Sequence, residues 1–222
     1  MPSKTHRIAF CKSVLPSVMD GSKTLTSRVM RFGKDVDGEP DHYQLEYVVG
    51  AYAYFSYMGC YDLIEVKCPY GEPGDILRVK EGYRIISNLS RTRHVAGFYT
   101  VGTTKFNVEL TQDEYAKWCK RKYPYRATPG RFMYNSLCRT TLINREVRVE
   151  RLQDITKKDA IAEGIGWSPA FPEGYTAPGC PRGFGSAEGA FMWLWNSINT
   201  RPGRTWDDNP WVWRVRFERV TE

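Results

Sequence analysis

The sequence predicts a mixed α+β protein, built around a small curved sheet or β-barrel that is surrounded by short helices. Residues 146–152 (EVRVERL) and 211–220 (WVWRVRFERV) alternate apolar with polar side chains, which is typical of half-buried strands. Strands of this kind are separated by short helical segments and long loops. No internal repeat or low-complexity tract interrupts the chain. We therefore expect a single α+β domain over residues 1–222.

The N-terminal part predicts a helix followed by a strand and an insertion. A short helix is expected over residues 13–20, with Pro16 tolerated in its first turn and Gly21 as its C-terminal stop. An extended segment begins at Leu25. Residues 33–66, roughly, begin with a turn-like stretch and continue with many tyrosines, and we expect them to form a hairpin or an inserted arm after this first helix–strand unit.

Residues 75–83 follow a Pro/Gly turn and predict the next strand. Its alternation places Glu81 on the apolar face, where a carboxylate is costly unless it is paired or hydrogen-bonded. The alternative is a strand-end glutamate that reaches solvent where the pattern stops. The two predicted faces are Ile76, Arg78, Lys80 and Leu77, Val79, Glu81.

Three further helices are expected in the second half of the chain. Residues 111–123 begin with Thr111 and Glu114 in capping-box spacing, inside a stretch of about 85–125 that we otherwise expect to be long loops. The second helix runs from a Thr156 cap to a Gly164 stop. A loop at about 167–185 leads to the third, over residues 186–199, whose core-facing side chains are Phe191, Leu194, Trp195 and Ile198.

The chain is basic, and the charge is concentrated in its middle. It has 32 Lys and Arg against 25 Asp and Glu, a net charge of +7. Residues 117–148 hold nine basic side chains and one acid, Glu146, interleaved with tyrosine, tryptophan and phenylalanine. Cations neutralise phosphates and aromatic rings stack on unpaired bases, so this pattern favours a nucleic-acid groove, with a solvated positive surface as the alternative. Trp206, Trp211 and Trp213 lie in or beside the last strand and are expected to pack rather than to stack on bases.

Several classes of protein are disfavoured. No apolar run of 18 residues is present, so no membrane association is expected, and the N-terminus lacks the apolar region of a secretory signal, which predicts a cytoplasmic protein. The six cysteines contain no CxxC pair, and the three histidines lie outside metal-binding motifs. We therefore expect no metal site and no cofactor.

The octet GSKTLTSR, residues 21–28, carries the most specific motif of the chain. Its Gly21, Lys23, Thr26 and Arg28 match the GxKxxTxR signature of the ASCH domain, which is related to the PUA fold. Three further blocks resemble bacteriophage and prophage members: PGDILRVKEGY, VRVERLQDITKKDAIAEGI, and FMWLWNSIN followed by WDDNPWVWRVRFERV. The resemblance spans nearly the whole chain, apart from about 33–66, 85–125 and 167–185.

The resemblance implies a pseudo-barrel with a cleft that binds RNA or modified bases, so the implied partners are RNA, DNA or a modified nucleoside. Some small bacterial members are amidohydrolases that deacetylate N4-acetylcytidine with a Lys, a Thr and a Glu, which correspond to Lys23, Thr26 and Glu81 here. Lysine would act as base for a threonine nucleophile, or would stabilise an oxyanion while the glutamate moves the proton. The alternative is polar side chains at a strand rim. The implied binding residues are Gly21, Arg28, Arg78, Lys80, Arg131 and Arg139.

The chain departs from the family pattern at two places. Arg78 replaces an aromatic residue in the family strand, which usually reads WVRETW, and RFMYNSLCR lacks the Pro and Trp of the usual RFMPRWASR. The hydrolysing members are also about half as long. Three hypotheses follow: a nucleic-acid or modified-nucleotide binding protein of phage origin, an amidohydrolase acting on an acylated nucleobase, and a phage accessory protein that binds a host protein through the aromatic segment 43–61.

Overall fold

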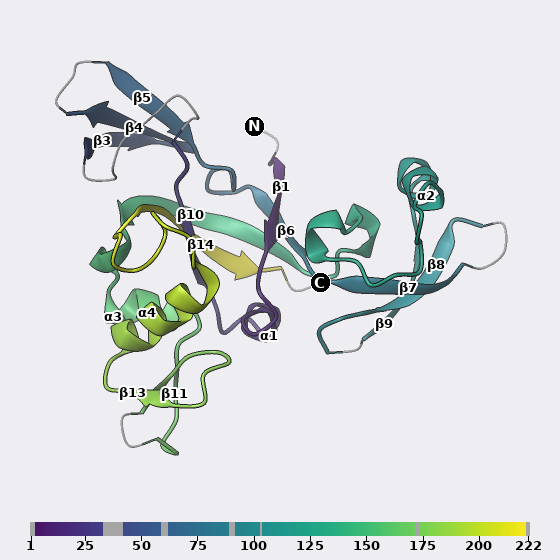
Figure 1. Ribbon diagram of the computed structural model, residues 1–222. Helices are drawn as coiled ribbons and strands as arrows, with labels where there is room; N and C mark the ends of the chain where they lie inside the picture. The colour runs from purple at the N-terminus through teal and green to yellow at the C-terminus, as the bar shows by residue number, and fades with distance from the viewer. Residues whose placement is uncertain are drawn as a thin grey trace.

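The computed structural model describes residues 3–32, 42–58, 62–88, 92–102, 104–171 and 174–220. Its centre is a five-stranded sheet in the order β1-β6-β10-β14-β2, in which only β1 and β6 run parallel (Figure 1). The strands are β1 (Thr5–Ala9), β6 (Ile76–Lys80), β10 (Thr141–Arg151), β14 (Trp211–Arg219) and β2 (Leu25–Val29). The mixed α+β class predicted from the sequence is confirmed.

The central sheet is open. Within the described ranges, β1 pairs only with β6 and β2 only with β14, so these two strands are edges and no barrel closes. The chain between them, residues 10–24, contains the helix α1 (Leu15–Met19) instead of a ladder between the two edges. Of the two expected architectures, a small curved sheet or a β-barrel, the described residues therefore form an open sheet and no closed barrel.

The helices begin and end where their capping residues predict. Thr156 accepts the backbone N–H of Asp159 at the start of α3 (Lys157–Ala162), and Ser186 caps α4 (Ala187–Ile198) through Gly189. Phe191, Leu194 and Trp195 of α4 are buried in the main core as expected. Ile198 was expected there too, but it is 49% exposed because it lies at the last turn.

The main core lies between this sheet and helices α1, α3 and α4. Strands β10 and β14 supply its centre, where Leu142, Val212 and Val215 are fully buried. Val212 and Val215 point to opposite faces of β14, so this strand is buried on both faces rather than half-buried as its alternation predicted. Trp213 is 1% exposed, and Trp206 and Trp211 are partly buried against the same cluster, so the prediction that these rings pack is confirmed.

The predicted insertion is a three-stranded antiparallel sheet that extends away from the central sheet (Figure 1). Its strands are β3 (Tyr43–Val49), β4 (Tyr52–Tyr57) and β5 (Leu63–Lys67). Residues 33–41 and 59–61 of the predicted arm lie outside the described residues. Phe55 of β4 is buried against Trp211 of β14, with ring centroids 5.2 Å apart, which joins the arm to the main core.

Residues of about 85–125 were expected to be long loops apart from the helix at 111–123, but the described residues of 83–109 form a third sheet with its own core. Strands β7 (Tyr83–Asn88), β8 (His94–Tyr99) and β9 (Lys105–Glu109) pair in sequence order, and α2 (Gln112–Cys119) follows with the predicted Thr111–Glu114 capping box. The predicted strand 75–83 is divided at Gly82, where a Cβ would lie 2.4 Å from Thr100 Oγ1. The chain turns there from the central sheet into this third sheet, which projects to the side opposite the arm (Figure 1).

The remaining predicted loop, 167–185, contains only short strands. These are β11 (Gly166–Trp167), β12 (Tyr175–Thr176) and β13 (Gly183–Phe184), with residues 172–173 outside the described part. Three short 3₁₀ helices, η2 (Gly130–Phe132), η3 (Asn135–Leu137) and η4 (Leu152–Asp154), complete the described elements. None of the described helices is long and apolar enough to cross a membrane.

Candidate functional site

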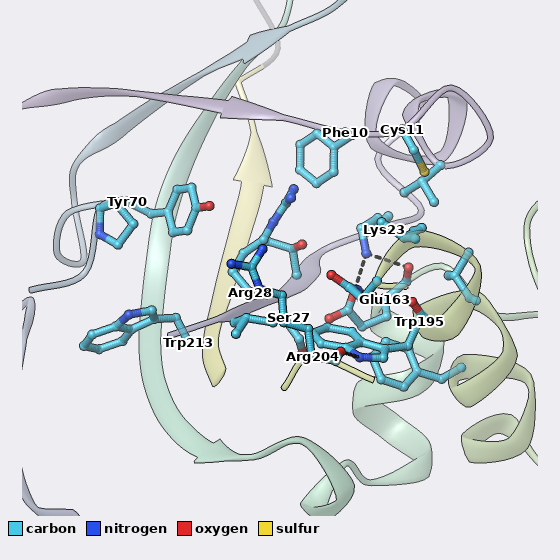
Figure 2. A pocket seen from close by; sticks show the side chains of 18 of the residues that line it. Phe10, Cys11, Lys23, Ser27, Arg28, Tyr70, Glu163, Trp195, Arg204 and Trp213 are labelled. Atoms are coloured by element: carbon cyan, nitrogen blue, oxygen red, sulfur yellow. Dashed lines mark hydrogen bonds and ion pairs between the residues drawn. The ribbon is translucent and has the colours of Figure 1, made fainter. Parts of the chain in front are cut away.

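The octet 21–28 borders a pocket of about 550 Å³ (Figure 2). Its walls come from β2 and the residues beside it, the residues after β1, the end of β5 with the turn that follows, the end of α3, α4 with the loop after it, and β14. Three signature residues, Lys23, Thr26 and Arg28, line the same pocket. The fourth, Gly21, has φ +85° and ends α1, as predicted, so its part is to turn the chain towards β2.

Lys23 is buried in an ion pair with Glu163. Its Nζ donates to the Glu163 carboxylate and also to the Glu163 backbone carbonyl, at 2.6 Å (Figure 2). The side chains are only 3% and 5% exposed. Burial lowers the pKa of Lys23 from its ordinary value, and the nearby carboxylate only partly opposes this effect. The other carboxylate oxygen of Glu163 is buried and has no hydrogen-bond partner among the described residues.

Backbone contacts place the lysine against the end of α3. The Lys23 N–H donates to Ser17 O and the Thr24 N–H donates to Ala162 O, both at 2.8 Å. Gly164 has φ +99°, and a Cβ there would lie 3.7 Å from the Lys23 side chain. The glycine that stops the helix therefore also turns the chain beside the lysine.

Thr26 and Arg28 follow Lys23 on β2. Thr26 pairs with Val215 across the sheet and is 4% exposed. Arg28 donates to Ala9 O at 2.6 Å, and its guanidinium lies 5.1 Å from the ring centroid of Phe10 and 5.9 Å from that of Tyr70. The arginine is thus held between the end of β1 and the turn before β6, with aromatic faces beside it.

The pocket is positively charged and lined by aromatic rings. Its described lining contains five cationic side chains and one acid, Glu163. The cations are Lys23, Arg28, Arg31, Lys67 and Arg204, and the aromatic residues are Phe10, Tyr70, Phe191, Trp195 and Trp213. A ligand that combines negative charge with a flat ring is the chemical complement of such a lining.

Glu81 does not line this pocket. It is 3% exposed and accepts two hydrogen bonds from Arg139, at 2.7 and 2.8 Å, so the expectation of a buried, paired carboxylate is confirmed. It lines a second hollow of about 510 Å³, which shares Phe10 and Cys11 with the pocket. The three residues that the resemblance assigns to catalysis are therefore divided between two neighbouring hollows.

Of the remaining sequence-predicted binding residues, Lys80 and Arg131 line the second hollow, whereas Arg78 and Arg139 do not. Lys80 is 3% exposed, lines this hollow, and donates to Asn135 Oδ1 at 2.6 Å; burial lowers its pKa. Arg78 donates to Asn135 O at 3.3 Å, and Arg131 is exposed at the rim of the hollow. Arg139 is occupied by Glu81.

Sequence reasoning missed Glu163, the carboxylate that faces Lys23. One signal was available: Glu163 is the C-cap residue of α3, where a negative charge is unfavourable unless a cation is close. Tyr70, Trp195 and Arg204 were missed as well, because they come from three separate segments that only the fold brings together. No group of His, Cys, Asp and Glu within the described ranges is arranged to hold a metal ion.

Comparison with known proteins gives no relative: no protein family, no curated protein and no solved structure matches this chain.

Proposed function

We propose that this chain is an ASCH-type protein of the PUA-like class and that its pocket binds a modified nucleotide. The proposal rests on one observation above all. The lining combines five cations and a single acid with five aromatic side chains, in a space of about 550 Å³. Arginine and lysine pair with phosphate, and a nucleobase can stack on the partly exposed rings of Phe10 and Tyr70, so both parts of a nucleotide find partners there. The other three rings, Phe191, Trp195 and Trp213, are buried in the core behind the lining. The convergence of Lys23, Thr26 and Arg28 supports the resemblance.

Isothermal titration calorimetry with nucleoside monophosphates and their nucleosides tests this function. We expect the phosphate to improve affinity, and we expect this advantage to shrink as salt rises. Arg28→Gln should weaken monophosphate binding by roughly tenfold, since it removes a charge-assisted contact. Arg145→Gln is the matched control, because Arg145 is exposed and pairs with Glu218 outside the pocket. Equal binding of both ligand classes by all three proteins would contradict the proposal.

Hydrolysis of an acylated nucleobase is the second candidate function. It is favoured by a buried lysine of lowered pKa that lines the same pocket as a threonine. In this version the Thr26 hydroxyl attacks the acyl carbonyl, and its proton passes through the Lys23–Glu163 pair to the amino nitrogen of the base as the C–N bond breaks. Water then hydrolyses the acyl-threonine ester, which releases the acid and restores the hydroxyl. The carboxylate beside the lysine is Glu163 rather than Glu81.

Mass spectrometry of N4-acetylcytidine incubated with the protein tests this candidate. Thr26→Val should abolish turnover, whereas Thr24→Val should retain it, because Thr24 lies on the same segment but does not line the pocket. Comparison of Glu163→Gln with Glu81→Gln then identifies the carboxylate that the reaction needs. Absence of turnover by the wild-type protein would remove this candidate and leave the binding function standing.

A further inference from the structure

A second surface with nucleic-acid chemistry lies in the loop of residues 120–133, between α2 and the end of η2. Three of its aromatic rings are exposed to solvent: Tyr123 by 59%, Tyr125 by 46% and Phe132 by 55%. Large rings usually bury most of their surface, so three exposed rings within ten residues require an explanation. Exposed aromatic faces are where unpaired bases stack.

The loop also carries positive charge that the protein does not neutralise. Lys120, Lys122, Arg126 and Arg131 are exposed, and none has an ion-pair partner among the described residues. Two of these cations lie over the exposed rings, with Lys122 5.4 Å from the Tyr123 centroid and Arg131 4.8 Å from that of Phe132. No acid occurs in the sequence between Glu114 and Glu146.

The nearest acid in the sequence is already engaged. The Glu114 carboxylate accepts hydrogen bonds from the backbone N–H of Asn135 at 2.7 Å and from the Ser136 hydroxyl at 2.5 Å, and its burial is intermediate. It binds the start of η3, the segment that follows the loop, and none of its hydrogen-bond partners among the described residues belongs to the loop itself. The exposed charges are thus available to phosphates.

The loop is held in place before any ligand binds. Thr128 and Tyr83 exchange two backbone hydrogen bonds, at 2.7 and 3.0 Å, which attach the loop to β7. Arg84 Nε donates to Tyr125 O at 3.1 Å, and Trp118 Nε1 donates to Pro124 O at 3.2 Å. A surface that is already ordered loses little conformational entropy on binding.

The same loop leads to the pocket. Residues 127–131 form one wall of the second hollow, and Phe10 and Cys11 form part of another. Phe10 and Cys11 also line the pocket that contains Lys23. Lys12 and Lys80 add positive charge to the hollow between the two. The loop, the hollow and the pocket therefore adjoin one another.

We propose that the substrate is a single-stranded polynucleotide, which lies along loop 120–133 and the second hollow and places one nucleotide in the pocket. Bases stack on the exposed rings and phosphates contact the unpaired cations. This inference rests on the proposed nucleotide-binding function, and it replaces a free nucleotide with a strand as the ligand. RNA and DNA strands share this chemistry, and the experiment below separates them.

Fluorescence anisotropy with labelled oligonucleotides of about 12 nucleotides tests the proposal, using RNA, single-stranded DNA and duplex DNA. We expect a single strand to bind more tightly than the duplex and more tightly than a mononucleotide. Phe132→Ala should weaken strand binding by roughly 5- to 150-fold, the range for loss of one stacked base. Tyr47→Ala is the matched control, since Tyr47 is also 47% exposed but lies on the inserted arm.

Salt dependence provides a second readout. Lys122→Gln combined with Arg126→Gln should reduce the slope of log affinity against log salt by about 0.7 for each lost phosphate contact. Lys158→Gln, an exposed lysine on α3, should leave that slope unchanged. Both loop cations are exposed, so these substitutions leave the fold intact.

The outcomes separate this inference from the function on which it rests. Loop variants that lose strand binding but keep mononucleotide binding support the inference. The inference is overturned, while the pocket function stands, if a strand binds no more tightly than a mononucleotide. The same holds if the loop variants leave the affinity for a strand unchanged. Absence of both mononucleotide and strand binding by the wild-type protein refutes the pocket function and this inference together.

Discussion

The buried pair of Lys23 and Glu163 is the feature whose removal should cost the protein most. Lys23→Met deletes the ammonium but leaves the Glu163 carboxylate buried, at 5% exposure, without its ion-pair partner. Loss of one partner of a buried pair costs about 3–5 kcal/mol. For a chain of this size, such a loss lowers the melting temperature by about 6–20 °C. It is also a large part of the free energy of unfolding of a typical protein, about 5–15 kcal/mol.

A double-mutant cycle separates this pair from the general cost of altering a core. Glu163→Met leaves an unpaired buried ammonium and should cost a similar amount, whereas the double variant replaces both charges with apolar side chains and should recover much of the loss. We expect a coupling free energy of at least about 2 kcal/mol by urea unfolding. The reasoning would be refuted if the stability losses of the two single variants add up to that of the double variant. It would also be refuted if the free energy of unfolding of Lys23→Met lies within about 0.5 kcal/mol of the wild-type value.

The pH dependence of stability gives the same cycle an independent check. The pKa of Lys23 is lowered in the folded state, so over the interval below its ordinary value of 10.5 the unfolded chain binds more protons than the folded one. Stability contributed by this group therefore rises with pH in that interval. Wild type should gain stability relative to Lys23→Met as the pH rises towards 10.5, as measured by urea unfolding at each pH.

Three further changes test other parts of the fold. Burial raises the pKa of Tyr99 to about 12, so the wild-type protein should lose stability between about pH 10 and 12. Tyr99→Phe should lose less stability over this range in alkaline denaturation followed by circular dichroism. Parallel curves for the two proteins would contradict this. Thr111→Ala removes the capping box of α2 and should cost about 1 kcal/mol in urea unfolding, and no loss would show that the cap is dispensable. Gly164→Ala should cost about 1 kcal/mol or more of stability because φ at Gly164 is +99°. Gly185 has open space around it and no positive φ, so Gly185→Ala should be nearly neutral. Equal losses of stability in the two variants would contradict the conformational argument.

Local chemistry explains why several features could be predicted from the sequence. Caps at Thr111 and Thr156 and the stops at Gly21 and Gly164 depend on residues within one helical turn, and all four lie where predicted. Glu81 could be singled out because strand alternation is also local. The rule that a buried carboxylate needs a partner predicts a pair there, but only the fold shows that Arg139 supplies it.

The third sheet could not be predicted in the same way. Strands β7 to β9 bury their apolar residues against Trp118, Met133 and Leu137, which come from α2 and from the segment that follows it. Its strands have five or six residues each, and their alternation is too short to distinguish them from a loop. The strand that continues past Glu81 is divided by Gly82, whose close approach to Thr100 depends on the fold.

The separation of Glu81 from Lys23 decides which chemistry the pocket can support. Glu81 accepts one hydrogen bond from Arg139 on each carboxylate oxygen, and it lines the second hollow rather than the pocket that contains Lys23. Glu163 touches Lys23 and keeps one carboxylate oxygen without a hydrogen-bond partner among the described residues. If the pocket hydrolyses its ligand, a proton that leaves Thr26 must therefore pass to the Lys23–Glu163 pair. If no such transfer occurs, the same pair serves to hold β2 against α3 as the wall of a binding site.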